Sequence, residues 1–198
     1  MSACRRVAVV IAITTLFATL FSAPVKAADP QPPFIPASAD WLTAVNYFRA
    51  MVGVGAIYDD PALSSGAYNH SCYMLLNDIA HDEVPGAPGY TSSGDAAGNA
   101  GNVAVSSATG LTNRSFVELW MTAPFHAIGL LRPNLQRAGY GQCENANTVR
   151  WHSGATLNVL TGLGPQQGLA DPILFPGNGT VTSLTNFIAE SPNPVEMC

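Results

Sequence analysis

The chain has 198 residues, of which 47% are hydrophobic and only 11% are charged, and its formal net charge is −5. This length is enough for one domain with a sizeable core. A net negative protein with scattered basic residues binds nucleic acid and anionic membranes poorly, because both need clustered cations. The composition therefore argues against a nucleic-acid partner and says little else about function.

The first 27 residues have the features of a secretory signal peptide. Arg5 and Arg6 precede an apolar run over 7–21, and Val25-Lys26-Ala27 places small residues before a cleavage site. The run is short for a bilayer span, which needs roughly 20 residues. We therefore expect a signal peptide over 1–27 that is removed, with an uncleaved anchor as the alternative. Cleavage would leave no integral membrane segment and a protein that is secreted or held in the cell envelope.

Helix signals dominate the first half of the remaining chain, after a Pro-rich lead-in over 28–37. Asp60-Pro61 combines a capping side chain with Pro at the first helical position, which is a strong start signal. Pro124 ends the last helix, and a short further turn carries His126. The spacing of apolar residues predicts helices over 41–52, 61–77 and 113–122.

The second half has a different pattern. Residues 84–110 are rich in Gly, Ser, Ala and Pro, and we expect a long, mostly irregular segment there. Short apolar segments joined by turns follow Pro133, and they indicate an α+β fold with helices packed on an antiparallel sheet. Residues 165–198 are expected to form a turn-rich extension, truncated or loosely ordered. The predicted strands are 136–143, 148–152 and 155–161.

Short motifs in a fixed order run through the central part of the chain. They are Asn46-Tyr47-Phe48-Arg49, Leu63 with Ala67 and His70, His81, Gly101-Asn102-Val103-Ala104, Trp120-Met121-Thr122-Ala123-Pro124-Phe125-His126, and Gly139-Tyr140-Gly141. This set resembles the CAP superfamily (cysteine-rich secretory proteins, antigen 5 and pathogenesis-related 1) in its bacterial SCP-like form. The resemblance implies a three-layer α-β-α sandwich with a central antiparallel sheet, and we expect this domain over 38–164.

The resemblance also implies a surface cleft lined by two histidines and two acidic residues. His81 matches the first histidine and His126 the second, while Asn102 follows the position of the first acid. Gly101 stands where that acid is expected, and Ala123 stands at the position of the second. The sequence therefore predicts a cleft with His81, His126 and Asn102 but without its usual carboxylates.

The missing acids weaken the case for a metal. Two imidazoles with two carboxylates can hold a divalent ion or transfer protons. His81 and His126 alone form an incomplete zinc site, so we expect weak zinc binding and infer no certain cofactor. His70 lies on the apolar stripe of its helix, and we expect a buried, hydrogen-bonded core histidine there. The residues that could complete the zinc site are Asp82, Glu83, Asp95 and His70.

Three cysteines remain after removal of the signal: Cys72, Cys143 and Cys198. An exported chain meets an oxidising compartment, where a disulfide is the default. We expect Cys72 to pair with Cys143, because the helix that carries Cys72 should pack beside the strand that ends at Cys143. Cys198 would then be free or pair outside the chain. Cys72 also lies near His70, as in a Cys–His nucleophile, but export favours the disulfide.

Other catalytic motifs do not occur in the sequence, neither a Gly-x-Ser-x-Gly elbow nor a His-Glu-x-x-His helix. The leading prediction is a secreted CAP-domain protein without enzymatic activity, which binds a small, lipid-like ligand or a surface partner around His81 and His126. Some relatives bind sterols or other lipids, and this part of the prediction comes only from the resemblance. The alternatives are a metal-assisted hydrolase that uses the same histidines and a structural cell-envelope protein.

Overall fold

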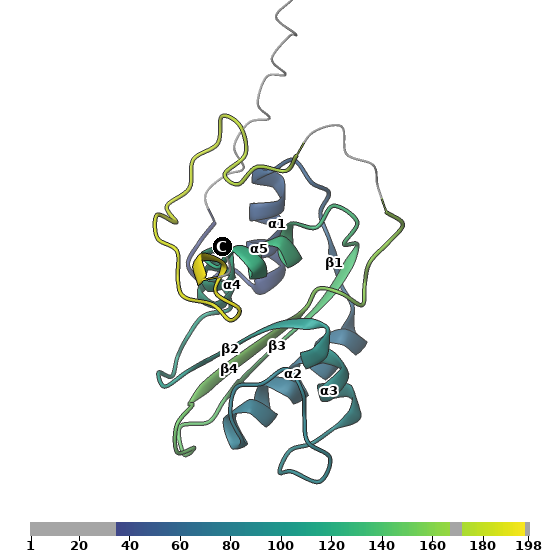
Figure 1. Cartoon of the computed structure of the whole chain (residues 1–198), viewed down its shortest axis with the longest axis vertical. Coiled ribbons are helices and arrows are strands. Elements are labelled where there is room, and N and C mark those ends of the chain that lie inside the picture. The colour runs from purple at the N-terminus through teal and green to yellow at the C-terminus, as the bar shows by residue number, and fades with distance from the viewer. Residues whose placement is uncertain (1–34, 167–171, 197–198) are drawn as a thin grey trace, which may run out of the picture.

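The computed structural model describes residues 35–166 and 172–196. The predicted signal peptide, most of the Pro-rich lead-in and Cys198 lie outside these ranges. The described residues form three layers, with helices on both sides of a central sheet (Figure 1). The helices are α1 (Trp41–Met51), α2 (Pro61–Leu76), α3 (Ser92–Asn99), α4 (Asn113–Met121), α5 (Pro124–Leu131) and the 3-10 helix η1 (Pro194–Glu196). The strands are β1 (Tyr58–Asp59), β2 (Gly101–Ser106), β3 (Arg137–Glu144) and β4 (Ser153–Asn158).

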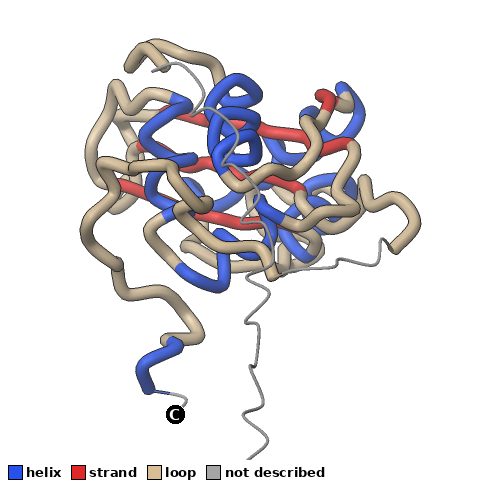
Figure 2. The backbone as a smooth tube through the Cα atoms, turned by 90° about the horizontal axis from the view of Figure 1, so that it is seen from above, coloured by secondary structure: helices blue, strands red, loops and turns tan. Residues whose placement is uncertain are grey.

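The sheet has the strand order β1-β3-β4-β2. Strand β4 pairs antiparallel with both of its neighbours, so that Asn158 lies opposite Gly101 on one side and Gly139 on the other. The two-residue strand β1 pairs parallel with β3 and makes the sheet mixed. All six residues of β4 are buried, because helices cover both faces of the sheet (Figure 2). The expected α-β-α sandwich is confirmed, and β2 forms one of its open edges.

Helices α2 and α3 cover one face of the sheet, while α1, α4 and α5 cover the other (Figure 1). Gly139 and Gly141 allow α2 to lie directly on β3. A Cβ atom at Gly139 would overlap the main chain of Leu63, and one at Gly141 would overlap the main chain of Tyr68. The Gly139-Tyr140-Gly141 motif therefore sets how closely the helical layer approaches the sheet.

The predicted helices agree with the structure within one or two residues. The Asp40 carboxylate accepts a hydrogen bond of 2.7 Å from the main-chain N–H of Thr43 and caps α1. Asp60 caps α2 in the same way, with Pro61 at the first helical position. The short turn expected after Pro124 is a complete eight-residue helix, α5.

The prediction of a mostly irregular segment over 84–110 is wrong. Helix α3 and strand β2 both form inside it. The Thr91 hydroxyl accepts from the N–H of Gly94 and caps α3. The small residues of α3 then pack closely: a Cβ at Gly98 would overlap the ring of His70 on α2. Glycine and serine lower helix propensity, but tight packing against α2 overrides this preference.

The predicted strand over 148–152 is also wrong, because these residues belong to the turn between β3 and β4. The Asn145 side chain accepts from the N–H of Asn147, and the Thr148 hydroxyl donates to the Asn145 carbonyl. These local hydrogen bonds favour a turn over a strand. The last predicted strand, 155–161, is observed as β4 and starts two residues earlier.

The structure joins Cys72 of α2 to Cys143 of β3 by a disulfide, as expected. Their Cα atoms lie 5.1 Å apart, within the usual range for a disulfide. The bond holds the second helix against the central sheet across 71 residues of sequence.

Arg49 connects α1 to the end of α5. Its side chain is fully buried, and its guanidinium donates hydrogen bonds to the carbonyls of Gly55, Leu130, Arg132 and Leu135. Burial lowers the pKa of Arg49 to about 10, so the side chain stays charged at neutral pH. Four carbonyl partners in fixed positions make Arg49 a structural residue that orients α5.

Candidate functional site

A cavity of about 390 Å³ lies beside the open edge of the sheet and brings together residues from four parts of the chain. His81 comes from the segment between α2 and α3, Val103 from β2, and His126 from α5. The C-terminal extension supplies the remaining wall. The lining residues are Ile79, Ala80, His81, Val103, Trp120, Ala123, His126, Ile188, Ala189, Glu190 and Ser191. This cavity, which we call the histidine cleft, is mostly apolar and contains two imidazoles.

His126 is the third residue of α5, and its side chain is largely buried. Helix α5 begins after Ala123, whose side chain cannot cap the helix. The Glu190 carboxylate takes that role: it accepts hydrogen bonds from the main-chain N–H groups of Phe125 (2.9 Å) and His126 (3.2 Å). A carboxylate at a helix N-terminus is favourable because it pairs with the free N–H groups and the positive end of the helix dipole.

The same carboxylate also contacts the imidazole of His126. Oε2 of Glu190 lies 2.5 Å from Nδ1 of His126, and the Glu190 side chain is only 1% exposed. Because an ionised carboxylate only accepts hydrogen bonds, Nδ1 carries the proton. Glu190 thus fixes both the helix end and the orientation of this ring.

His81 lies on the opposite wall of the histidine cleft. Its Nδ1 donates a hydrogen bond of 2.8 Å to the main-chain carbonyl of Gly98, at the end of α3. Among the described residues, none hydrogen-bonds to Nε2 of either His81 or His126. When neutral, each ring therefore keeps a lone pair at Nε2 that can accept a hydrogen bond or bind a metal ion.

A buried ion pair holds the segment that carries His81. His70 and Glu83 have side chains with no exposed surface, and Nδ1 of His70 lies 3.0 Å from Oε1 of Glu83. The other ring nitrogen of His70 donates to the Ala80 carbonyl at 2.9 Å. Glu83 also accepts from the N–H of Thr91 at 2.8 Å. His70 is thus a buried, hydrogen-bonded core histidine, and it fixes the main chain next to His81.

The acids near His81 in sequence do not line the histidine cleft. Glu83 pairs with His70, and Asp95 accepts from the N–H of Glu83 at 2.8 Å. Asp82 is exposed and does not contribute to the lining. Within the described parts of the chain, no group of three or more His, Cys, Asp or Glu side chains is arranged to hold a metal ion. Weak zinc binding by the histidine pair stays a prediction.

Two motif positions play a different part from the one expected. Asn102 does not line the cavity; its amide donates a hydrogen bond of 3.0 Å to the main-chain carbonyl of His126. Asn102 therefore ties β2 to α5 and supports the cleft from behind. Gly101 is also absent from the lining, and a Cβ there would lie 2.7 Å from the Ala97 carbonyl oxygen. A glutamate at Gly101 would disturb this packing, whereas Ala123 does line the cavity.

Sequence reasoning missed Glu190, the carboxylate that orients His126. It lies 64 residues beyond His126 in a segment without regular structure around it. The one local signal was indirect: Ala123 leaves the start of α5 without a capping side chain. Nothing in the sequence between Ala123 and Glu190 indicates that an acid from the C-terminal extension caps the start of α5.

Comparison with known proteins agrees with this architecture. Residues 42–157 match the model of the cysteine-rich secretory protein family, CAP. The match lies within the predicted bounds of 38–164 and contains both histidines, Asn102 and the disulfide. No curated protein matches the chain. The family match covers more than half of the sequence, and the three-layer sandwich is the fold that the motifs predicted. The chain therefore belongs to the CAP, or cysteine-rich secretory protein, family.

Proposed function

We propose that this protein is a secreted, non-enzymatic CAP-domain protein that binds a small ligand in the histidine cleft. The observation that carries this proposal is the cavity of about 390 Å³ into which α5 and the segment after α2 bring His126 and His81. Its volume is within the range of ligand pockets, roughly 300–1,000 Å³. Its walls are mostly apolar, and its imidazoles supply the few polar groups that orient a ligand.

The hydrogen bonds of the two rings indicate what kind of ligand the cleft suits. Gly98 and Glu190 each accept from an Nδ1 atom, which leaves the Nε2 atoms of His81 and His126 as acceptors. A small, lipid-like molecule with an apolar body and a hydroxyl group would satisfy both the walls and an imidazole. A surface partner could use the same groups through an exposed side chain.

Secretion is the second part of the proposal. The basic, apolar and small-residue regions of the first 27 residues support export, and the Cys72–Cys143 disulfide suits an oxidising compartment. No helix in the described residues is long and apolar enough to cross a membrane.

One observation favours hydrolysis as a second candidate function. The Glu190 carboxylate bonded to Nδ1 of His126 is the arrangement that makes Nε2 of an imidazole a better base. The motif positions had offered no carboxylate for this purpose. In a hydrolase, His126 would take a proton from a water molecule at Nε2, and Glu190 would stabilise the resulting imidazolium. His81 would contact the substrate from the opposite wall.

The deciding experiment identifies small molecules that co-purify with the protein, by mass spectrometry of denatured samples. We expect the native protein to carry a ligand and the His81→Ala/His126→Ala variant to lose it. His152→Ala is the matched control, because His152 is half-buried and lies outside the cavity lining. A ligand that the double variant retains, or native protein without any ligand, would contradict the binding function. Stoichiometric zinc in the native protein and its loss in the double variant would favour the hydrolase.

A further inference from the structure

The C-terminal extension forms one wall of the histidine cleft, and the two imidazoles of the cleft differ in their access to solvent. The side chain of His126 is only 16% exposed and lies against Glu190, whereas His81 on the opposite wall is exposed. The residues of the extension that line the cleft are Ile188, Ala189, Glu190 and Ser191. We call residues 187–191 the strap. The strap covers the side of the histidine cleft on which His126 lies.

Polar contacts hold the strap to the start of α5 and the end of α4. The Glu190 carboxylate accepts from the main-chain N–H groups of Phe125 and His126 and lies against the His126 ring. Two residues earlier, the main-chain N–H of Ile188 donates to the carbonyl of Thr122 at 3.2 Å. All of these hydrogen bonds come from a span of three residues, so the strap is attached by a short polar latch.

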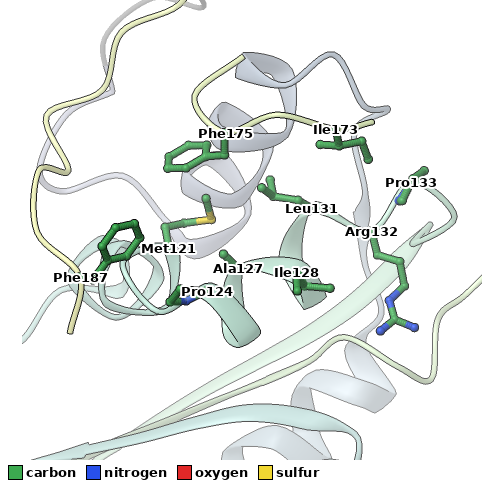
Figure 3. A pocket seen from close by; sticks show the side chains of 10 residues that line it. All are labelled: Met121, Pro124, Ala127, Ile128, Leu131, Arg132, Pro133, Ile173, Phe175 and Phe187. Carbon is green, nitrogen blue, oxygen red and sulfur yellow. The ribbon is translucent and has the colours of Figure 1, made fainter. Parts of the chain in front are cut away.

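Hydrophobic packing adds little to this attachment. Phe187 is 84% exposed and Ile188 is 37% exposed. Next to the strap, a cavity of about 340 Å³ separates the extension from α5, with Phe175 and Phe187 on the side of the extension (Figure 3). The extension is anchored further back, where Phe175 makes an edge-to-face contact with Phe48 of α1 at 5.9 Å between ring centroids. A segment with so little buried apolar surface opens locally at a lower free energy than the core.

The start of α5 can keep its position when the strap leaves. The amide of Asn102 on β2 donates to the main-chain carbonyl of His126, and this hydrogen bond does not involve the strap. The N–H groups that Glu190 caps belong to the first turn of a helix, where water can replace a side-chain acceptor. Opening therefore costs the hydrogen bonds of Glu190 and Ile188 but leaves the sheet and its helical layers intact.

We propose that the strap is a gate on the histidine cleft, latched by Glu190: it opens locally to admit a ligand to His126 and closes again over the bound ligand. The inference rests on the proposed function only in taking the histidine cleft as the binding site. The gate accounts for a cavity in which one imidazole faces solvent and the other lies behind a segment held by polar contacts.

The test measures access to His126 without any ligand. Diethyl pyrocarbonate acylates the unprotonated nitrogen of a neutral imidazole, and peptide mass spectrometry gives the rate at each histidine. In the native protein, His81 should react faster than His126. Glu190→Gln should raise the rate at His126 about tenfold or more, because charged hydrogen bonds of the latch are lost, and should leave the rate at His81 unchanged. Glu196→Gln is the matched control, since Glu196 is an exposed acid of the same extension.

A second variant separates opening of the strap from a change in the imidazole itself. Ile188→Pro removes the N–H that donates to Thr122 but keeps the Glu190 carboxylate, and it should also accelerate the reaction of His126. Hydrogen exchange should become faster in the strap and at the N–H groups of Phe125 and His126 in both variants. Exchange in β4, at the centre of the sheet, should stay as slow as in the native protein.

Three results would overturn the gate. They are equal rates at His81 and His126 in the native protein, a rate at His126 that Ile188→Pro leaves unchanged, and faster exchange in β4, which would indicate unfolding of the whole domain. None of these measurements needs a bound ligand. A protein that carries no co-purifying ligand but shows the expected rates would therefore contradict the proposed function and still support the gate.

Discussion

The carboxylate of Glu190 lies 2.5 Å from Nδ1 of His126, although 64 residues separate them in the chain. Glu190 belongs to the C-terminal extension, outside the matched family region of 42–157. It occupies the start of α5, where Ala123 provides no capping group. A segment outside the family region thus supplies a carboxylate to His126, which lies inside that region.

Glu190→Ala should lower the free energy of unfolding by about 1–2 kcal/mol, the usual cost of removing a helix cap. The N–H groups of Phe125 and His126 and the His126 ring would lose their shared acceptor. Urea denaturation measures this change. Asp82→Asn is the control, because Asp82 is an exposed acid and should change stability by less than about 0.5 kcal/mol. Equal stability of the two variants would show that Glu190 does not cap α5 in solution.

Glu83→Ala should be more damaging than Glu190→Ala. It removes one partner of a fully buried pair and leaves His70 without its acceptor, which costs about 3–5 kcal/mol in comparable cases. The cost should appear in thermal and urea unfolding. Glu118→Ala provides the comparison, since Glu118 forms a partly exposed pair with Arg114 within α4, a kind of pair that contributes at most about 1 kcal/mol.

Arg49→Lys should destabilise the protein even though the charge is kept. A lysine ammonium cannot reach the four carbonyls that the Arg49 guanidinium joins, so some would remain buried without a donor. We expect a loss of about 2–4 kcal/mol in the free energy of unfolding. Arg137→Lys, at an exposed pair with Asp60, should change it by less than about 1 kcal/mol. A similar small effect at both positions would contradict the structural role of Arg49.

Gly139→Ala tests the close approach of α2 to the sheet. The added methyl group would overlap the main chain of Leu63, and such overpacking costs about 1–3 kcal/mol. Gly55→Ala is the matched control, because a Cβ there meets no atom within 4 Å. Differential scanning calorimetry should show a lower melting temperature for Gly139→Ala alone.

The Cys72–Cys143 disulfide should contribute about 2–5 kcal/mol to stability. The Cys72→Ala/Cys143→Ala variant should therefore unfold at a lower denaturant concentration than the native protein. Peptide mapping of the oxidised protein should recover a linked peptide that contains both cysteines. Recovery of Cys72 linked to Cys198 would contradict the observed pairing.

Local sequence signals predicted the parts of the fold that depend on neighbouring residues. Asp40 and the Asp60-Pro61 pair each cap a helix through hydrogen bonds to residues two or three positions away, so both helices could be placed from sequence. The pairing of Cys72 with Cys143 could also be predicted, because the helix that carries Cys72 was expected to pack beside the strand that ends at Cys143. The segment over 84–110 could not be predicted in this way, because α3 depends on the fit of Gly98 against His70 and β2 on pairing with β4.

Residue type and short spacing were enough to identify the family and the helices with strong caps, and to predict a cleft around His81 and His126. What surrounds those histidines became clear only in three dimensions. The acid on His126 is Glu190 and not a motif residue, and Asn102 supports α5 from behind the histidine cleft. Each of these contacts joins segments far apart in the chain, and short-range patterns of charge and hydrophobicity carry no information about which distant segment will meet another.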